Sequence, residues 1–577
     1  MKMLLHRSAK SLTVEPRLDA DMIAACCVIA SALVSAGAVP STARRHELRF
    51  PDEYTVTGRL ILPHSDIEEP FAARCDGRSR KCRIDYYDGA MKTFQLGSEL
   101  FRIHWTPNPE THAPEENCRT VTLSDSEALE AKGVLPDPSE YEFARSEYCY
   151  AEASVWLRGV PYVDCDRYEW SSWYRDHASD HVLWVAKNAE GNSVPVRYRM
   201  SGKDDILKSQ YDEYEVIYDT YSAGPVDSRA FEVTSATSQP CLESSEAPEP
   251  SVPLFFNPIQ EFVRHNASHV DEYFAKFKKH HGKDYRFAAE ERQRRHNFRH
   301  NVRYVNSMNR RNLSYALKLN ERADSAREEL GTHGGCLRRA SRRFFGRDFS
   351  PEECRNDQIL PDHVDWRLEG AVTPVKNQGT CGSCWSFAVI AHLESQYFLN
   401  NGKENLTRFS EQQLVDCSWD FSNTGCSGGS IESAFSYVKE YGLFTDEQYG
   451  PYREEEGKCR DTVTGTEPTI STLEGFNAIG GKECLRNYIA LKGPIAVAID
   501  ASSPSFVYYS HGVYKNPACG RDLNHAVLAI GYGELNGEPY WLIKNSWGDI
   551  WGSEGFMLIS QENNTCGIED ELSYADL

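Results

Sequence analysis

The stretch QGTCGSCWSF (378–387) opens an apolar run, extending to Phe398, whose spacing fits a helix. A cysteine in the first turn of a helix lies at the positive end of the helix dipole, which lowers the pKa of its thiol and favours the reactive thiolate. Cys384 is therefore a candidate nucleophile, and Cys381, one turn earlier, is a candidate for a disulfide. A CxxC pattern on its own fits a redox pair or half of a metal site about equally well.

Two motifs further along the chain decide between these interpretations. LNHAVLAIGYG (523–533) places His525 about 140 positions after Cys384, and YWLIKNSWGDIWG (540–552) places Asn545 about 160 positions after it. Both lie in apolar runs typical of strands, which hold side chains rigidly. In this order and spacing the three motifs resemble the papain and cathepsin family of cysteine proteases.

The resemblance implies a mechanism for five residues. The Cys384 thiolate, paired with the His525 imidazolium, attacks the scissile carbonyl, and His525 then protonates the leaving amine. Asn545 orients the imidazole. Gln378, with the backbone N–H of Cys384, stabilises the tetrahedral oxyanion. Trp547 shields the His–Asn contact from water, with a plain core tryptophan as the alternative.

The resemblance also implies a substrate cleft. CSGG (426–429) matches the Gly-Gly segment that hydrogen-bonds the substrate backbone, and Glu571 falls at the far end of the pocket for the second residue before the cut. Because a carboxylate in an apolar pocket pairs with arginine, we expect acceptance of Leu, Phe and Arg there. A Glu571 that points to solvent is the alternative. The expected substrate-binding set is Gly428, Gly429, Ser430, Ile431, Ala498, Leu523, Ala526, Trp547 and Glu571.

The 18 cysteines favour an oxidising compartment. No pair of CxxC motifs at zinc-finger spacing occurs, so the sequence predicts no metal site, and it predicts no cofactor. Cys484 has no family partner and is expected to be a buried thiol rather than to bridge to Cys336 or Cys354. The six cysteines of the N-terminal half allow three disulfides of unknown connectivity. The resemblance implies the pairs Cys381–Cys426, Cys417–Cys459 and Cys519–Cys566.

A helical, basic segment precedes the protease part. Six of its residues, spaced three or four apart, share one face of a long helix and resemble the ERFNIN motif of cathepsin L-type propeptides. In the following YALKLNERAD (315–324), Lys318 replaces a Gly and Arg322 replaces a Phe of the second propeptide motif. The chain's own propeptide is thus an expected inhibitory partner. The six residues are Glu290, Arg294, Phe298, Asn301, Val305 (where the motif has Ile) and Asn309.

Activation of this precursor is expected in acid. The propeptide segment is basic and the enzyme is acidic, so protonation of carboxylates weakens their pairing as the pH falls. Cleavage is expected between Arg355 and Asp362.

The N-terminal half reads as short alternating strands, which predicts an antiparallel sheet or partial barrel. GRLILPHSDIEEPF (58–71) and RIDYYDGAMKTFQL (83–96) resemble arthropod 26/29 kDa digestive cysteine proteases, whose two parts are thought to stay together after processing. We expect this region to dock on the protease, with a lipid-holding barrel as the alternative. The predicted strands are 54–62, 81–87, 100–105, 180–187, 194–200 and 214–221.

The expected fold class is α+β. It combines a two-lobed papain-like domain (a helical lobe and a β-barrel lobe), a helical inhibitory propeptide and an N-terminal antiparallel β-rich domain. The boundaries are 1–43 for a signal region, 44–245 for the β-rich domain, 246–257 for a linker, 258–359 for the propeptide and 360–577 for the protease.

Several features point to the secretory pathway, and from there to a lysosome, a digestive vacuole or the exterior. The apolar run 22–39 ends in Ala36-Gly37-Ala38, a signal-peptidase type of site, with an uncleaved anchor as the alternative. We expect no stable membrane insertion of the mature protein. The net charge of −22 argues against nucleic-acid binding. Glycosylation triplets stand at Asn266, Asn312, Asn405 and Asn563.

The predicted function is therefore a cysteine endopeptidase, made as a zymogen, with proteins and peptides as substrates. A binding protein built on a protease fold is one alternative, which the intact set of catalytic residue types disfavours. An exopeptidase is another, but no cleft-blocking insertion stands between Cys426 and Tyr441.

Overall fold

The structure is a computed structural model of the 577-residue chain. The expected signal region, most of the expected linker, Asn266 and Asn405 lie outside the residues that it describes. Residues Leu48–Leu577 form one compact unit. The described residues are 48–124, 133–150, 162–174, 177–234, 240–243, 257–264, 268–332, 336–337, 347–348, 354, 358–403, 406–460 and 466–577.

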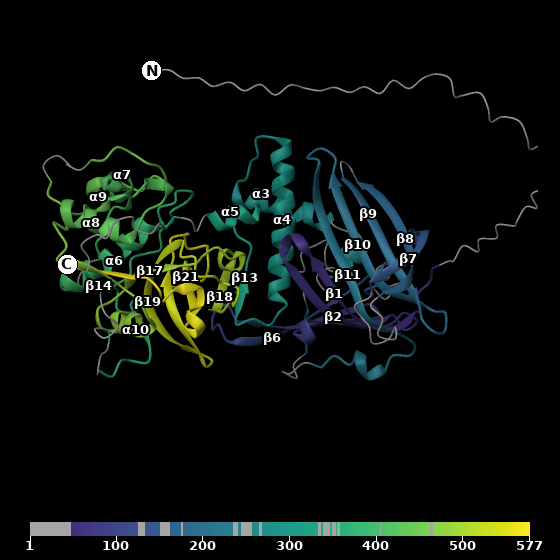
Figure 1. The fold of residues 1–577 in the computed structure, drawn as a ribbon. Helices are drawn as coiled ribbons and strands as arrows, with labels where there is room; N and C mark the ends of the chain where they lie inside the picture. Colours follow the sequence, from purple (N-terminus) through teal and green to yellow (C-terminus); the bar gives the residue numbers. More distant parts are fainter. Residues whose placement is uncertain are drawn as a thin grey trace, which may run out of the picture. The chain divides into compact units, whose positions relative to one another are not determined.

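A twelve-stranded sheet makes up the N-terminal region (Figure 1). Alternating burial along its strands places one set of side chains in a core, as period-two patterning requires. All six predicted strands are confirmed. The strands are β1 (Glu53–Leu62), β2 (Ile67–Asp76), β3 (Lys81–Tyr86), β4 (Met91–Leu96), β5 (Glu99–Pro107), β6 (Pro114–Thr122), β7 (Glu142–Tyr150), β8 (Tyr162–Tyr174), β9 (His177–Lys187), β10 (Ser193–Asp204), β11 (Ser209–Ala223) and β12 (Leu242–Glu243).

Two antiparallel meanders, β1–β6 and β7–β11, join through the pairing of β1 with β11. The strand order runs β12-β6-β5-β4-β3-β2-β1-β11-β10-β9-β8-β7, and β12 pairs with β6 in parallel. Within the described residues no pairing joins β12 to β7, so the sheet is open there and the expected partial barrel is not confirmed. Disulfides link Cys75–Cys82, Cys118–Cys241 and Cys149–Cys165, a connectivity that the sequence could not supply.

The middle segment, which corresponds to the expected propeptide (258–359), is mainly helical up to α5, as predicted. The expected motif face lies on the single helix α4, and its asparagines bind the chain that follows: Asn301 Nδ2 donates to the carbonyl oxygens of Ala323 and Ser325, both at 2.9 Å. The elements are α2 (Gln260–Val263), α3 (Ser268–His281), α4 (Ala288–Asn309), β13 (Tyr315–Leu317), α5 (Arg327–Thr332) and β14 (Arg347–Asp348).

The C-terminal region packs helices against a ten-stranded sheet (Figure 1). Along one path its order is β13-β18-β21-β20-β19-β17-β22-β16-β14, and β15 pairs with β19. Strands β13 and β14 of the middle segment therefore cover both ends of this path. The helices are α6 (Cys384–Asn400), α7 (Glu411–Cys417), α8 (Ile431–Tyr441), α9 (Asp446–Tyr449), α10 (Lys482–Leu491) and α11 (Pro504–Val507). The strands are β15 (Val364–Asp365), β16 (Gly475–Ile479), β17 (Ile495–Ile499), β18 (Tyr509–Tyr514), β19 (His525–Leu535), β20 (Glu538–Lys544), β21 (Phe556–Ser560) and β22 (Leu572–Asp576).

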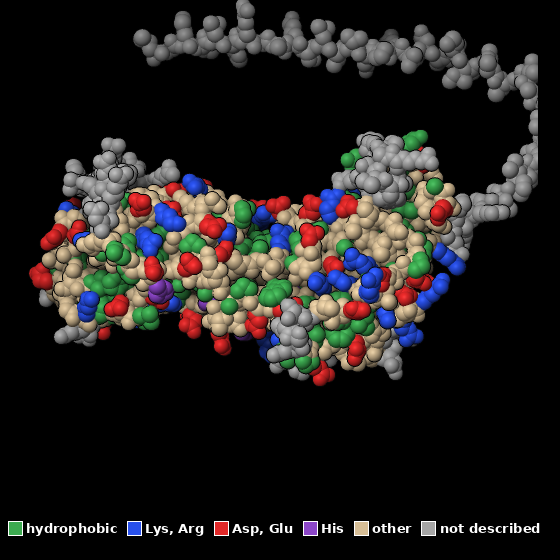
Figure 2. Space-filling view, turned by 90° about the horizontal axis from the view of Figure 1, so that it is seen from below, with side chains coloured by type: hydrophobic (Ala, Val, Ile, Leu, Met, Phe, Trp, Pro, Cys, Tyr) green, Lys and Arg blue, Asp and Glu red, His purple; other side chains and the backbone are tan. Residues whose placement is uncertain are grey.

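The surface is charged and mixed. On the face drawn in Figure 2, acidic and basic side chains are interspersed with hydrophobic and other side chains, which is typical of a solvated surface. Among the described residues, no helix combines the length and the hydrophobicity that a bilayer crossing requires.

Candidate active site

The candidate nucleophile stands at a helix start. Cys384 is the first residue of α6, and its side chain is fully buried. Helix α6 is buried along most of its length because it packs against α8 and β19. The backbone N–H groups of its first turn have no partner within the helix, so positive charge is concentrated at Cys384.

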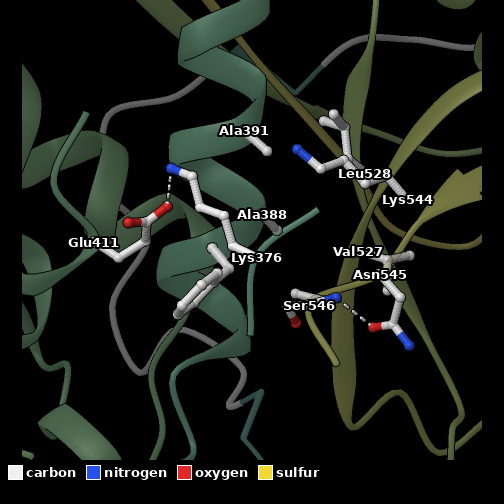
Figure 3. A pocket seen from close by; sticks show the side chains of 11 residues that line it. Lys376, Ala388, Ala391, Glu411, Val527, Leu528, Lys544, Asn545 and Ser546 are labelled. Carbon is white, nitrogen blue, oxygen red and sulfur yellow. Dashed lines mark hydrogen bonds and ion pairs between the residues drawn. The ribbon is translucent and has the colours of Figure 1, made fainter. Parts of the chain in front are cut away.

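The candidate base and its orienting amide come from neighbouring strands. His525 begins β19 and Asn545 directly follows β20, and the antiparallel pairing of these strands brings the two residues together. His525 Nε2 lies 2.8 Å from Asn545 Oδ1. The backbone N–H of Ser546 donates to the same Oδ1 at 2.8 Å, which fixes the orientation of the amide (Figure 3). His525 Nε2 must therefore carry the ring proton, and Nδ1 is left as the basic nitrogen.

That basic nitrogen faces sulfur. Cys384 Sγ, Cys336 Sγ and a ring nitrogen of His525 all lie within 4.8 Å of one another. Burial lowers the pKa of His525 to about 4, although the hydrogen bond to Asn545 opposes this shift. Trp547 lies over the imidazole with ring centroids 4.8 Å apart, and its side chain is buried. This position fits both of the expected roles, a shield beside the His–Asn contact and a core tryptophan.

The sulfur of Cys384 is in a disulfide with Cys336. Sequence reasoning considered Cys336 only as a partner for Cys484, so this contact was missed. No spacing signal could have found it, because the two cysteines meet only when the middle segment crosses the site. Cys336 Sγ lies 3.6 Å from His525 Nδ1.

Gln378 is held rigidly beside the helix start. Its Nε2 donates to the carbonyl oxygen of Cys381 at 3.1 Å, and its Oε1 accepts from Ser546 Oγ at 2.7 Å. The backbone N–H of Gln378 donates to the Ser546 carbonyl oxygen at 2.8 Å. The amide therefore sits close to the start of α6 with little freedom to turn.

The middle segment occupies the expected substrate cleft. Leu337 forms a parallel bridge with Gly429, whose N–H donates to the Cys336 carbonyl oxygen at 3.0 Å. On the other side, Leu337 N–H donates to the carbonyl oxygen of Asn524 at 3.0 Å. Position 429 needs glycine, because a Cβ there would lie within 2.7 Å of Trp385 atoms. The peptide that crosses the cleft is thus bonded on both edges.

The expected pocket residues lie on elements around this crossing. Ser430 caps α8 by accepting from Ser433 N–H at 3.1 Å. Ala498 of β17 pairs with Ala526 of β19, and its N–H donates to the Glu571 carbonyl oxygen at 3.0 Å. Glu571 is half-buried. Gly428 has a φ of 108°, Ile431 is buried and Leu523 is half-buried.

A cluster of charged side chains lies near Asn545 (Figure 3). A cavity of about 20 Å³, near the size of one water molecule, lies between Lys376, Lys544 and Asn545. Lys376 bonds to Glu394 at 2.7 Å and to Glu411, and these carboxylates raise its pKa despite its burial. Burial lowers the pKa of Lys544 to about 8. Sequence reasoning missed this cluster, because nothing in the separate segments marks these residues as neighbours.

Disulfides also frame the region. The structure contains the pairs Cys381–Cys426, Cys417–Cys459 and Cys519–Cys566. The expectation of a free Cys484 thiol was wrong, because Cys484 is bonded to Cys354. Both sulfur-bearing side chains are buried in one core, and Asn487 Nδ2 donates to the Cys354 carbonyl oxygen. The middle segment is therefore tied to the C-terminal region by two disulfides.

Arg322, which replaces a Phe of the second propeptide motif, lies beside Trp547. Its guanidinium carbon lies 4.6 Å from the Trp547 ring centroid, so a cation stands where the propeptide motif has a Phe. Burial lowers the pKa of Arg322, and its charge in turn contributes to lowering the pKa of His525.

Comparisons with known proteins agree with this geometry. The papain family cysteine protease model matches residues 360–576, and the cathepsin propeptide inhibitor domain (I29) matches residues 274–330. Cathepsin S of Bos taurus is 38% identical over 54% of this chain and 95% of that protein. Oryzain gamma chain of Oryza sativa subsp. japonica is 39% identical over 55% of this chain and 90% of that protein.

A digestive cysteine proteinase 2 of Homarus americanus is 39% identical over 52% of this chain and 92% of that protein. Among solved structures, digestive procathepsin L2 of Tenebrio molitor larval midgut is 37% identical and covers 53% of this chain and 100% of that chain, with a TM-score of 0.49. The sequence matches, which span nearly the whole of each relative, show that this chain belongs to the papain family of cysteine proteases and carries a cathepsin propeptide.

Proposed function

We propose that this zymogen matures to an endopeptidase that cleaves peptide bonds with Cys384, His525 and Asn545. One observation carries the proposal: His525 binds Asn545 through Nε2 at 2.8 Å, and a ring nitrogen of His525 lies within 4.8 Å of Cys384 Sγ at the start of α6. In the free enzyme, the proton of the Cys384 thiol passes to Nδ1 and leaves a thiolate. That thiolate attacks the carbonyl carbon, and the Nδ1 proton then goes to the leaving amine.

The oxyanion of this reaction would be stabilised by Gln378 and by the backbone N–H of Cys384. The supporting observation is the fixed position of the Gln378 amide, which is held at both of its polar atoms and does not need to reorganise during the reaction. Trp547, over His525, would keep water from the hydrogen bond to Asn545.

We further propose that the pocket before the cut accepts Leu, Phe and Arg. Ile431, Ala498 and Ala526 give it buried apolar walls, and the half-buried Glu571 supplies a carboxylate. An arginine that enters such a pocket keeps its charge paired while its methylene groups are buried.

The N-terminal β-rich region is proposed to stay with the protease after cleavage. His511 Nε2 of β18 donates to the Pro107 carbonyl oxygen at 3.0 Å, and Gly512 N–H donates to His112 Nδ1 at 3.2 Å. These bonds do not involve the propeptide, so its removal would leave them in place. A secretory location is part of the proposal, because all eight disulfides of the described residues fit an oxidising compartment.

The proposal is tested with the purified precursor in acid with a thiol reductant. Wild type should cut itself between residues 355 and 362 and then hydrolyse peptides internally, whereas Cys384→Ala should do neither. The Asn545→Ala variant should process itself slowly, because the imidazole of His525 is no longer oriented. If wild type and Cys384→Ala are equally inert after complete removal of the propeptide by another protease, the proposed catalytic site is wrong.

A further inference from the structure

The strongest unexplained feature of the molecule is the bond between Cys336 and the nucleophile. A propeptide that only fills the cleft blocks an enzyme sterically, and the free thiol beneath it stays intact. Here the propeptide contributes a sulfur of its own, bonded to Cys384. Both cysteines are buried, with 2% and 0% of their surface exposed.

The backbone fixes Cys336 in this position independently of the sulfur bond. Its carbonyl oxygen accepts from Gly429 N–H, and the next residue, Leu337, donates to the Asn524 carbonyl oxygen, so the chain is held on both sides of the cleft. A Cβ built at Gly382 would lie 3.4 Å from the Cys336 Cβ, which shows how closely the propeptide passes the loop before α6. The backbone of Cys336 is therefore held beside the loop that precedes the nucleophile.

We propose that Cys336 makes this precursor a thiol-activated zymogen, in which Cys384 has no reactive sulfur until a small thiol compound reduces the bond. The inference rests on the proposed function of Cys384 and adds a chemical block to the steric one. Removing the propeptide by proteolysis alone would leave a Cys336 peptide attached to the nucleophile.

The reduction balances with two molecules of a thiol, RSH. The first attacks Cys336 Sγ as a thiolate, which breaks the bond to Cys384 and forms a mixed disulfide, R–S–S–Cys336. Cys384 leaves as a thiolate, and the proton released by RSH is taken up by His525 Nδ1. A second RSH attacks the mixed disulfide and gives RSSR and a Cys336 thiol, so two electrons pass from the reductant to the protein.

The direction of the first attack follows from the surroundings of the two sulfurs. Both sulfurs lie close to His525, but of the two cysteines Cys384 is the one at the start of a helix, where a thiolate is stabilised. The sulfur with the lower thiol pKa leaves faster, so exchange releases the nucleophile and keeps the small thiol on the propeptide.

The same three groups, Cys336 Sγ, Cys384 Sγ and a ring nitrogen of His525, could instead hold a Zn²⁺ ion if both thiols were reduced. The two states differ in a measurable way. A disulfide leaves no thiol to alkylate and needs no metal, whereas a zinc site has two free thiols after unfolding and one bound ion.

The first test does not depend on catalysis. Precursor secreted under oxidising conditions is unfolded in an alkylating agent without reductant, digested and analysed by mass spectrometry, and its zinc content is measured. We expect a linked pair of peptides containing Cys336 and Cys384, unlabelled and split by reductant. In Cys336→Ser, Cys384 should become labelled. Labelled Cys336 and Cys384 in the wild type would overturn the proposal, and equimolar zinc with them would identify a metal site instead.

The second test measures release of the nucleophile. Pepsin, which has no thiol chemistry, removes the propeptide in acid, and active sites are then titrated with a peptidyl epoxide in the absence of oxygen. Wild type should show titratable sites equimolar with protein only after a thiol is added, and Cys336→Ser should show them without it. The matched control Cys354→Ser removes the other propeptide disulfide and should behave like wild type. Equal titration of wild type with and without thiol would contradict the proposal, while a lack of titration in every variant with thiol would point to failure of the proposed catalytic site.

Discussion

The guanidinium of Arg303, on the propeptide helix α4, lies against the carboxylate of Asp212 on β11, with nitrogen–oxygen distances of 2.7 and 3.0 Å. Both side chains are buried. Seven residues along the chain, Arg310 makes the same kind of contact with Glu69 of β2. The basic face of the propeptide thus pairs with the N-terminal sheet, and the acidic partner anticipated in the enzyme is found instead in the β-rich region.

Asp212→Asn should destabilise the precursor by about 3–5 kcal/mol, because it leaves the buried Arg303 without its main counter-charge. The measurement is the free energy of unfolding in urea. Asp205→Asn, at an exposed carboxylate in the turn between β10 and β11, is the matched control and should change little. In the double variant Asp212→Asn with Arg303→Met the two losses should not add, because both changes break the same ion pair, and fully additive losses would contradict this account.

This ion pair would not supply the activation in mild acid that the sequence predicts. Arg303 and Arg299 hold the pKa of Asp212 well below its usual range in spite of burial. A carboxyl whose folded pKa is depressed loses its contribution only as the pH falls below the ordinary range of Asp, near 3.9. The pairing of α4 with the sheet therefore persists at the pH where lysosomal or digestive proteases would work.

His296 supplies a better acid sensor in the same contact. It is buried between α4 and the sheet, and burial, Arg299 and His177 lower its pKa to about 3, against the opposing charge of Asp204. The unfolded histidine, with a pKa near 6.5, takes up a proton first, so stability falls as the pH drops from about 6.5 toward 3.

His296→Gln should therefore flatten the pH dependence of precursor stability between pH 7 and pH 4.5 by about 2 kcal/mol. Urea unfolding at the two pH values gives the difference directly. His280→Gln, at an exposed histidine of α3, should leave the difference unchanged. A steeper loss in acid for His296→Gln than for wild type would reverse the expected sign.

Local periodicity and motif spacing predicted a large part of the molecule. The six-residue stripe appears on α4 because helical spacing is a local property, and Cys384, His525 and Asn545 meet because the motifs sit on a helix start and on paired strands. The bonds of Cys336 and Cys354 could not be predicted this way. These bonds depend on the path of the propeptide across the cleft. The sequence around Cys336 and Cys354 contains no pattern that predicts this path.

The expectation drawn from net charge, that the basic propeptide pairs with the acidic enzyme, fails for a related reason. The propeptide is basic and the enzyme is acidic, but the sum of charges does not tell which carboxylates a helix meets. Asp212 and Glu69 lie on strands whose alternating pattern marks which residues are buried and says nothing about a basic helix as their partner. The order of the strands in the N-terminal sheet likewise depends on long-range pairing. Among the described residues, the pairing of β1 with β11 joins the two meanders, and no local pattern predicts it.

Arg322→Phe should stabilise the precursor by about 1 kcal/mol or more, because it exchanges a buried cation over Trp547 for the apolar residue of the family motif. The check is the thermal midpoint of the precursor. Mature kcat/KM should be unchanged, since Arg322 leaves with the propeptide. A lower thermal midpoint would mean that the contact between the guanidinium and the indole outweighs the cost of burying the charge.

Glu571 offers a test of specificity in the mature enzyme. Glu571→Gln keeps the size of the side chain and removes its charge. A substrate with Arg as the second residue before the cut therefore loses a charge-assisted hydrogen bond worth about 1.5–3 kcal/mol. We expect kcat/KM for such a substrate to fall by about 10- to 150-fold, while kcat/KM for the matching Leu substrate stays constant. Glu554→Gln, at an exposed glutamate before β21, serves as the control for a general change in charge. Equal losses for the Arg and Leu substrates would show that the Glu571 side chain supports the shape of the pocket and does not bind the charge of the substrate.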